Sequence, residues 1–366
     1  MLYYLHELAD VHILFNLFQY VTVRSAGALV TALLVAFAMG PTVIRWLTRL
    51  RVGQVVRESG PQTHLAKAGT PTMGGTLIIL AAVVSTVLWG RPNGYTALCL
   101  LALVWMGAIG FLDDYLKVVQ KKTQGLVGRL KMAGQLTFGL GLGVYLLLRP
   151  IAPYPSNWTG VPFLSDQFAL LAPWVFVILV ALVIAGSSNA VNLTDGLDGL
   201  AAGLGAIAAM TFAVFAYVTG RVDTAEYLGL FYLPGAEEMT IFGLALSGAS
   251  IGFLWFNAHP AEVFMGDTGS LALGGALGVM AILLKSEFLL IIIGGVFVME
   301  AVSVMLQVGV YKFTARRSGE GRRVLLMAPI HHHFEKLGWP ESKVVIRFWI
   351  LGILCAMVAV STLKIR

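Results

Sequence analysis

Two adjacent carboxylates, Asp113 and Asp114, directly follow an apolar run of the sequence. Carboxylates at the end of a membrane helix are unfavourable unless a cation holds them, and hard cations such as Mg²⁺ prefer oxygen ligands. If the helix continues past this boundary, Lys117 lies one turn from Asp113, where it could neutralise a carboxylate or meet a phosphate. An interfacial charge cluster with an ordinary salt bridge explains the same residues, so this motif alone leaves both interpretations open.

A second polar segment, residues 189–199, joins two apolar runs by a short turn. It holds the amides of Asn189 and Asn192 and the carboxylates of Asp195 and Asp198. Helix capping at Asp195 or its neighbour explains only one of these side chains. Polar side chains that alternate with glycines could instead hold a sugar or a base by hydrogen bonds, and we favour this interpretation.

Asp267 lies between two glycines, directly before a glycine-rich apolar run. A helix N-terminus at this point would favour an anion, but an N-capping aspartate explains the residue equally well. Phe264 could stack on a base, although a phenylalanine beside a membrane is more often an interfacial anchor. Lys67, in an earlier loop, is either a contact for a phosphate or a base, or a charge that sets the topology.

Three consecutive histidines, His331, His332 and His333, follow the segment Met-Ala-Pro-Ile. Adjacent ligands rarely fit one tetrahedral zinc site, and no cysteine accompanies these. Phosphate binding or proton donation suits three imidazoles better in a pocket that already holds carboxylates. Glu300 lies within an apolar run, where pairing inside the helix bundle is favoured over a catalytic role.

The composition identifies the elements that must position these residues. The 366 residues are 58% hydrophobic and 12% charged, against roughly 45–50% and about 25% in soluble proteins. We therefore exclude a pair of soluble domains and predict an all-α, polytopic membrane protein with a single membrane domain over residues 1–366. Apolar runs long enough to cross a bilayer predict ten transmembrane helices, at residues 21–43, 72–89, 95–112, 132–148, 171–190, 200–219, 239–257, 270–284, 288–311 and 345–363.

The loops between these runs divide by charge. Most of the 25 Lys and Arg residues fall in one set of alternate loops, which are residues 45–71, 113–131, 194–199, 258–269 and 312–347. Basic segments of this kind stay in the cytoplasm. We therefore expect an active site on the cytoplasmic face, both termini in the periplasm, and residues 1–20 as a short interfacial segment.

Other function classes are excluded or disfavoured. Two cysteines in apolar runs cannot form a disulfide framework, and the net charge of +6 follows from membrane topology without nucleic-acid binding. An intramembrane aspartyl protease would need a Tyr-Asp pair and a Gly-x-Gly-Asp motif, and the sequence has neither. A proton-coupled transporter stays as the alternative from another class, although only Glu300 lies deep in a predicted span.

Six motifs lie in order between residues 55 and 350. They are Gly69-Thr-Pro-Thr-Met-Gly-Gly75, Asp113-Asp114-Tyr115-x-Lys117, Asn189 to Gly199, Phe253-Leu-Trp-Phe-Asn257, Phe264-Met-Gly-Asp267 and Ala328-Pro-Ile-His-His-His333. Their combination resembles the polyprenyl-phosphate N-acetylhexosamine-1-phosphate transferases, without a departure at the motif positions. The Ala-Pro-Ile-His-His-His segment indicates the branch that acts on a muramoyl-pentapeptide; the related UDP-GlcNAc:undecaprenyl-phosphate GlcNAc-1-phosphate transferases are the alternative within the family.

The resemblance implies the reaction, the cofactor and the partners. Members of this branch transfer phospho-N-acetylmuramoyl-pentapeptide from UDP-MurNAc-pentapeptide to undecaprenyl phosphate, which gives lipid I and UMP in the first membrane step of peptidoglycan synthesis. They require Mg²⁺. The chain would then be an enzyme of the bacterial inner (cytoplasmic) membrane whose partners are these two substrates and the lipid bilayer. A glycine-rich bundle is also compatible with a homodimer.

The resemblance also implies roles for individual residues. Asp267, with Asp114, would hold Mg²⁺, and Asp113 would deprotonate or orient the undecaprenyl phosphate. Direct attack by the lipid phosphate and a covalent intermediate on Asp114 both stay open. The side chains expected to guide anionic groups or to contact the diphosphate are Lys117, Lys121, Arg129, His331, His332 and His333. Those expected to bind the uridine and the sugar are Lys67, Thr72, Asn189, Asn192, Asp195, Gly196, Leu197, Asp198, Asn257, Phe264 and Gly266.

Overall fold

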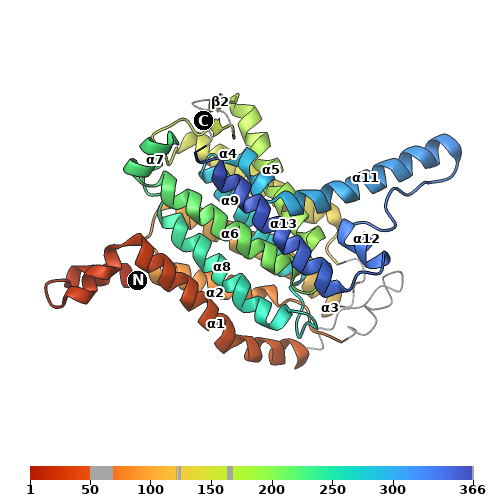
Figure 1. The fold of residues 1–366 in the computed structure, drawn as a ribbon, viewed down its shortest axis with the longest axis horizontal. Coiled ribbons are helices and arrows are strands. Elements are labelled where there is room, and N and C mark those ends of the chain that lie inside the picture. Colours follow the sequence, from red (N-terminus) through yellow and green to blue (C-terminus); the bar gives the residue numbers. More distant parts are fainter. Residues whose placement is uncertain (50–68, 121, 123–124, 163–167, 365–366) are drawn as a thin grey trace.

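A computed structural model of the chain describes residues 1–49, 69–120, 122, 125–162 and 168–364. The described residues form a helical bundle with almost no strand, which confirms the predicted all-α membrane fold (Figure 1). Nine helices within these ranges are long and apolar enough to cross a membrane. The tenth predicted span is present as helix α2, Gly75–Trp89, which has 15 residues and is shorter than the roughly 20 that usually span a bilayer.

Helix formation follows from the apolar composition, because in lipid every backbone N–H and C=O group must find a partner inside the protein. The nine long helices are α1 (Val21–Arg49), α3 (Gly94–Val118), α4 (Gly128–Leu148), α5 (Pro173–Thr194), α6 (Leu200–Thr219), α8 (Glu238–Asn257), α9 (Gly266–Leu283), α11 (Gly295–Ser318) and α13 (Glu341–Ser361). Three shorter helices connect them, namely α7 (Val222–Leu228), α10 (Glu287–Ile293) and α12 (Ile330–Lys336).

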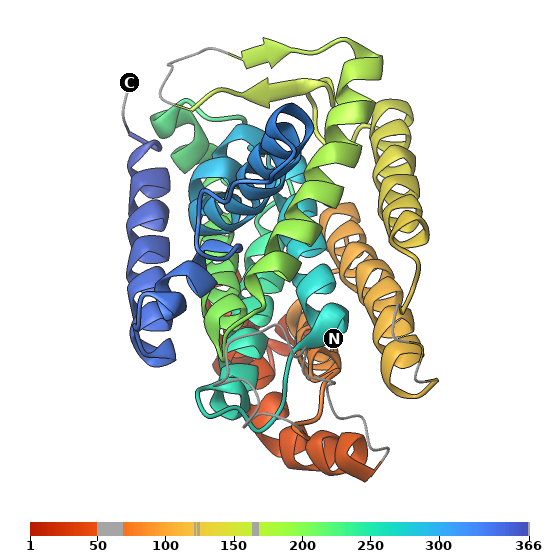
Figure 2. The same cartoon turned by 90° about the vertical axis from the view of Figure 1, so that its right-hand side faces the viewer.

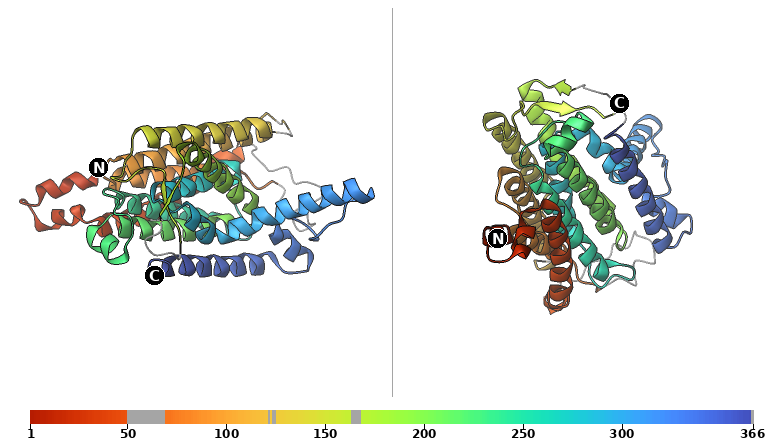
Figure 3. Two further views of the ribbon diagram at one scale, coloured as in Figure 1. Left: turned by 90° about the horizontal axis from the view of Figure 1, so that it is seen from above. Right: turned by 60° about the vertical axis from the view of Figure 1, so that its left-hand side comes forward.

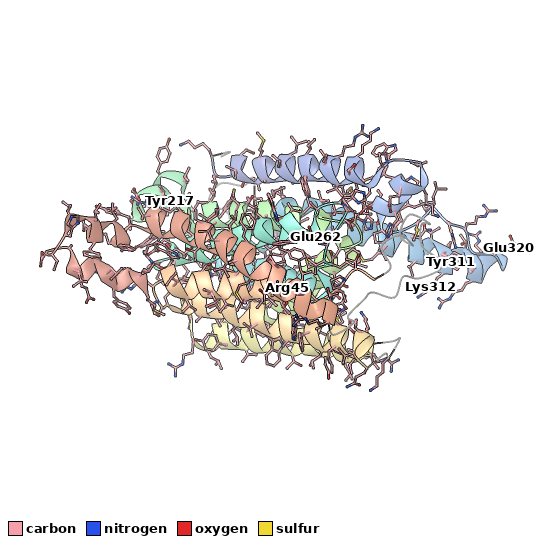
Figure 4. All side chains as sticks on the ribbon, turned by 90° about the horizontal axis from the view of Figure 1, so that it is seen from below. Arg45, Tyr217, Glu262, Tyr311, Lys312 and Glu320 are labelled. Carbon is pink, nitrogen blue, oxygen red and sulfur yellow. The ribbon has the colours of Figure 1, made fainter. Side chains whose placement is uncertain are left out.

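The predicted span at residues 288–311 is divided into two helices. Helix α10 ends just before the pair Gly294-Gly295, and α11 starts at the second of these glycines. Adjacent glycines weaken a helix because they lose the most backbone entropy on folding and add no side-chain packing. Beyond the break α11 extends away from the bundle, and Tyr311 and Glu320 lie on or just beyond its projecting part (Figures 1 and 4).

Two segments outside the spans have their own structure. The N-terminal residues form two short 3-10 helices, η1 at Leu2–Leu8 and η2 at Ile13–Gln19, in place of one interfacial helix. Between α4 and α5 an antiparallel hairpin pairs β1, Trp158–Gly160, with β2, Phe168–Leu170. The hairpin lies where α4 ends and α5 begins (Figure 2), and we call this the hairpin end of the bundle.

Both chain termini lie toward the hairpin end, whereas α12 and the projecting part of α11 lie at the opposite end (Figure 3). An even number of crossings requires that the two termini share a side. The opposite end also holds the C-terminal part of α3 and the start of α9, which carry the acidic motifs. We call it the site end.

Helix α9 is the centre of the bundle. In its most apolar stretch 89% of the residues are buried, against 22% for α1 and α11. Small residues let its neighbours approach closely: a Cβ atom on Gly110 of α3 would lie 2.1 Å from the carbonyl oxygen of Asp267, and one on Gly75 of α2 would lie 2.1 Å from the Cα atom of Gly269. Because these positions are glycines, α3 and α2 pack directly on the N-terminus of α9.

Candidate active site

Asp114 is buried near the end of α3, with 4% of its surface exposed. Its Oδ1 accepts a hydrogen bond from the backbone N–H of Asp267 at 3.2 Å. Its Oδ2 accepts bonds from the backbone N–H and the hydroxyl of Thr268 at 2.9 and 2.7 Å. These bonds satisfy N–H groups that the first turn of α9 cannot pair within the helix, and a negative charge is favourable at that terminus. Asp114 thereby joins α3 to α9.

Asp113 is buried beside it and contacts the segment that follows α3. Its Oδ1 accepts a hydrogen bond from the backbone N–H of Leu126 at 2.7 Å, and its Oδ2 lies 2.5 Å from Nζ of Lys117. Helix α3 continues to Val118, so the ion pair expected one turn apart in a continuous helix is present. The negative charge of Asp113 is therefore balanced within its own helix.

Asp267 lies in the first turn of α9 and receives hydrogen bonds from three other helices. Asn192 of α5 donates from Nδ2 to Oδ1 at 2.7 Å. Oδ2 accepts from Nζ of Lys131 at 2.6 Å and from Nζ of Lys117 at 3.1 Å. Nζ of Lys131 also lies 3.8 Å from Oδ2 of Asp113, so two lysines bridge the two carboxylates.

Lys131 is a candidate that the sequence analysis missed. It lies in the first turn of α4, and its side chain is 15% exposed against 39% for that of Lys117. The residues predicted in the same basic segment were Lys121, which lies outside the described residues, and Arg129, which is exposed on α4. The segment is visibly basic in the sequence, but which cation points inward depends on where α4 begins and how it packs on α3.

Three carboxylates at this site could hold a metal ion. Ligand oxygens of Asp113, Asp114 and Asp267 lie within 4.8 Å of one another. Oxygen donors suit a hard divalent cation, and the adjoining lysines show that the cluster already attracts positive charge. The donor set therefore fits such an ion.

The turn between α5 and α6 places a further carboxyl group beside the cluster. Asp195 follows the last residue of α5 and does not start a helix, since α6 begins only after Gly199. Gly199 has a φ of +80°, a backbone conformation that favours glycine. The backbone N–H of Gly266 donates to Asp195. Burial, followed by the negative charges of Asp267 and Asp114, raises the pKa of the Asp195 carboxyl to about 8. At neutral pH this carboxyl is therefore mainly protonated and able to donate a hydrogen bond.

The three predicted amide side chains have different surroundings. Asn192 donates from Nδ2 to Ser270 Oγ at 2.8 Å as well as to the acidic cluster. Asn189 donates instead to Oε1 of Gln135 in α4 at 2.7 Å. Asn257 accepts from the backbone N–H of Gly199 at 3.0 Å and donates to a carbonyl oxygen of its own loop. Only Asn192 reaches the carboxylates, and the other two fix helices or loops around them.

The motifs that contain Thr72 and Phe264 lie side by side, because the backbone N–H of Phe264 donates to the carbonyl oxygen of Pro71 at 2.8 Å. Gly266, which follows shortly after, has a φ of +73°. A Cβ atom there would lie 2.6 Å from Oδ2 of Asp114 and 2.8 Å from Oγ1 of Thr72. Thr72 therefore lies next to the acidic cluster, and Phe264 is partly buried at its edge.

A second group of metal-ligand types, Asp198, His259 and Glu341, also has ligand atoms within 4.8 Å of one another. Nδ1 of His259 lies 3.1 Å from Asp198 Oδ2 and 3.5 Å from Glu341 Oε2. Glu341 Oε1 accepts from the backbone N–H of Asp198 at 2.7 Å, and Asp198 Oδ2 accepts from that of Ala261 at 3.2 Å. These contacts tie the turn after α5 to the segment before α9 and to the start of α13.

The three histidines follow one another in α12 but face different partners. His331 is fully buried, with Nδ1 3.1 Å from Oε1 of Glu300, so the expected pairing of Glu300 inside the bundle is present. Nδ1 of His332 lies 2.7 Å from a carboxylate oxygen of Glu335. His333 accepts at Nδ1 from a backbone N–H at 3.1 Å. His332 and His333 are partly exposed.

Of the remaining predicted residues, Lys67 lies outside the described residues, and Leu197 is buried with 3% of its surface exposed. Gly196 is partly buried against the first two histidines: a Cβ atom there would lie 2.3 Å from Nε2 of His331 and 3.3 Å from Nε2 of His332. The structure thus brings the turn after α5 and the histidine helix into direct contact.

Comparisons with known proteins identify the family of this chain. Residues 96–285 match Glycosyl transferase family 4, and residues 67–79 match the phospho-N-acetylmuramoyl-pentapeptide-transferase signature 1. Curated relatives named phospho-N-acetylmuramoyl-pentapeptide-transferase are similar over at least 94% of their length. The protein of Gemmatimonas aurantiaca is 56% identical with 100% of both chains covered, and that of Desulfotalea psychrophila is 51% identical with 96% of both covered. That of Chloroherpeton thalassium is 50% identical, with 95% of this chain and 94% of the relative covered. Full-length identity at this level, on a helical membrane bundle with an acidic site, shows that the chain belongs to the phospho-N-acetylmuramoyl-pentapeptide-transferase family.

Proposed function

We propose that the cluster of Asp113, Asp114 and Asp267 is the active site of a phosphoglycosyl transferase. As a member of its family, the chain transfers phospho-N-acetylmuramoyl-pentapeptide from UDP-MurNAc-pentapeptide to undecaprenyl phosphate and forms lipid I and UMP, in the first membrane step of peptidoglycan synthesis. The observation that carries the assignment is the convergence of three carboxylates with Lys117 and Lys131 from three helices. Both substrates carry phosphates, so their mutual repulsion must be screened before they react.

We assign Mg²⁺ to Asp267 and Asp114, whose carboxylate oxygens are ligands of the type that this ion prefers. When bound, Mg²⁺ supplies charge neutralisation for the diphosphate and for the leaving UMP. Asp114 is held rigidly by its hydrogen bonds to the start of α9. Asp267 is oriented by Asn192 through Oδ1, and its Oδ2 is shared between the two lysines.

The remaining groups of the site bind and position the two phosphates. An oxygen of undecaprenyl phosphate attacks the phosphorus that bears the sugar, and the bond between that phosphorus and the bridging oxygen breaks as UMP leaves. Asp113 accepts the proton of the lipid phosphate or orients it, and Lys117 and Lys131 bind diphosphate oxygens. Both oxygens of Asp114 already accept hydrogen bonds from α9, which supports direct attack over a covalent intermediate on Asp114.

We assign the uridine to the turn at residues 195–199 and to Phe264, which can stack on uracil. The protonated carboxyl of Asp195 can donate a hydrogen bond to a uracil or ribose oxygen. Thr72 and Asn192 lie beside the carboxylates and are assigned to the same substrate. The residues that support this nucleotide site or lie at its edge are Asn189, Gly196, Leu197, Asp198, Asn257 and Gly266. Substrate contacts by Lys67, Lys121 and Arg129 stay predictions.

We place this integral membrane protein in the bacterial cytoplasmic membrane, with the site end facing the cytoplasm. The basic loops and the soluble nucleotide substrate support this orientation. A homodimer stays a prediction from the glycine-rich bundle.

The test is UMP release by detergent-purified protein with Mg²⁺. UMP that forms from UDP-MurNAc-pentapeptide only when undecaprenyl phosphate is added is the expected result. UMP from UDP-GlcNAc instead would contradict the substrate assignment and favour the related GlcNAc-1-phosphate transferase. Solute uptake by proteoliposomes without UMP release from either nucleotide would favour a transporter.

A further inference from the structure

Glu300 of α11 and His331 of α12 form a pair that is closed off from solvent. Both side chains are 0% exposed, and Oε1 of Glu300 lies 3.1 Å from Nδ1 of His331. A carboxylate in such a place is strongly destabilising without a partner. The two side chains lie within ion-pair distance of each other, and this contact fixes which edge of the imidazole faces α11.

The opposite edge of the same ring contacts the turn at residues 195–199, to which the uridine is assigned and which we call the nucleotide turn. A Cβ atom on Gly196 would lie 2.3 Å from Nε2 of His331 and 2.9 Å from its Cε1 atom. The ring is thus in close contact with the backbone of the residue that follows Asp195. A rotation of this imidazole would either push on the turn or leave a gap behind it.

A separate hydrogen-bond chain fixes α12 on α11 without the carboxylate. The hydroxyl of Ser303 donates to the backbone carbonyl of Glu300 at 2.6 Å and accepts from the backbone N–H of Ile330 at 3.0 Å. Docking of the two helices and orientation of the imidazole therefore depend on different side chains. This separation allows the two roles to be tested independently.

We propose that Glu300 is a positioning residue that holds His331 against Gly196 and thereby sets the nucleotide-binding turn. His331, being fully buried, acts through Gly196, and the partly exposed His332 and His333 face the diphosphate or the sugar. A carboxylate that lies beside Nδ1 and orients a working imidazole is a recurrent arrangement in enzymes. The inference rests on the proposed assignment of the uridine to this turn.

The first test compares Glu300→Gln with Ser303→Ala by calorimetric titration of UMP and by steady-state kinetics. Because Gln keeps the shape of Glu300 but removes its charge, we expect the Kd of UMP and the KM of UDP-MurNAc-pentapeptide to rise by about tenfold. The KM of undecaprenyl phosphate should stay unchanged. Ser303→Ala should lower the melting temperature and leave the Kd of UMP as in the wild type.

A second test uses the contact itself and remains informative if Glu300→Gln folds poorly. Gly196→Ala places a methyl group on the ring of His331 and should weaken UMP binding. Combining it with His331→Ala removes the obstructing ring, so the double variant should bind UMP more tightly than the product of the two single effects predicts. Simple additivity would show that the ring does not act through Gly196.

Two outcomes would overturn the inference, and they differ from failure of the proposed site. If Glu300→Gln only lowers the melting temperature, as Ser303→Ala does, Glu300 is a structural residue. If it raises the KM values of both substrates equally, it does not act on the nucleotide turn. Asp195→Ala separates the two levels, because it removes the hydrogen-bond donor: an unchanged Kd of UMP in that variant would show that the uridine assignment is wrong, whatever Glu300 does.

Discussion

Replacement of Lys131 by Met tests how the cluster balances charge. Nζ of Lys131 lies 2.6 Å from Oδ2 of Asp267, and both side chains are mostly buried, at 15% and 16% exposed. At an effective dielectric constant of about 20, unit charges about 3 Å apart attract by roughly 5–6 kcal/mol. Truncation of one partner of such a pair usually costs about 2–5 kcal/mol.

Lys117 reduces the free-energy cost of removing Lys131, because its Nζ lies 3.1 Å from the same oxygen of Asp267. We therefore expect the lower part of the range, about 2–3 kcal/mol, which corresponds to a decrease in kcat/KM of about 30- to 160-fold. The Mg²⁺ concentration at half-maximal activity should fall, because Lys131 competes with a metal ion for Asp267. A lower kcat/KM together with a lower Mg²⁺ concentration at half-maximal activity distinguishes this role from a general loss of folding.

The assay is UMP release in detergent micelles over a Mg²⁺ titration. Lys122→Met is the matched control, because Lys122 is an exposed lysine of the same connecting segment, and it should retain activity within about twofold. Wild-type kcat/KM in Lys131→Met, or a higher requirement for Mg²⁺, would refute the reasoning about charge balance.

Three further predictions concern pH, packing and stability. The pKa of Asp195 is raised to about 8, so its carboxyl is neutral below that pH and ionises as the pH rises through it. Calorimetry should therefore show that UMP binding weakens above pH 8 in the wild type and not in Asp195→Asn. A wild-type Kd of UMP that does not change with pH would contradict this. In Gly110→Ala the added methyl group would lie 2.1 Å from the carbonyl oxygen of Asp267, so we expect α9 to shift and kcat to fall by about 100-fold; unchanged kinetics would show that the close approach is unimportant. Arg24 and Glu238 form a buried double hydrogen bond of 2.6 and 2.8 Å, so Glu238→Ala should destabilise the fold by about 3–5 kcal/mol in thermal unfolding, whereas replacing both residues by Met should restore most of the stability.

Much of the membrane fold could be predicted from the sequence, because apolar runs of sufficient length form helices in lipid regardless of tertiary detail. The break at Gly294-Gly295 could not be placed, because two glycines inside an apolar run are also common in continuous packed helices. The hairpin between α4 and α5 could not be predicted from the sequence either, because its strands have three residues each. Three residues are too few for a recognisable alternation of polar and apolar side chains.

The site shows the same division between local and long-range information. Asp113, Asp114 and Asp267 stand out because charged side chains at membrane boundaries need a reason, and the structure brings them together. Lys131 was missed because its position depends on how α4 crosses α3, which no local pattern encodes. Asn189 donates to Gln135 of α4, a contact that the sequence could not show, because an amide that binds a ligand and one that joins two helices have the same appearance in sequence. Its contact with substrate stays a prediction.

The central claim is that the three carboxylates at the site end form the active site. The most direct test is the Mg²⁺-dependent, lipid-dependent release of UMP from UDP-MurNAc-pentapeptide by Asp267→Asn. The matched control is Asp223→Asn, an exposed aspartate at the hairpin end that pairs with Arg221. Loss of several kcal/mol of transition-state stabilisation predicts a decrease in kcat/KM of about 1000-fold or more in Asp267→Asn, with wild-type activity in the control. Folded Asp267→Asn protein that keeps wild-type activity and an unchanged response to Mg²⁺ would contradict the account.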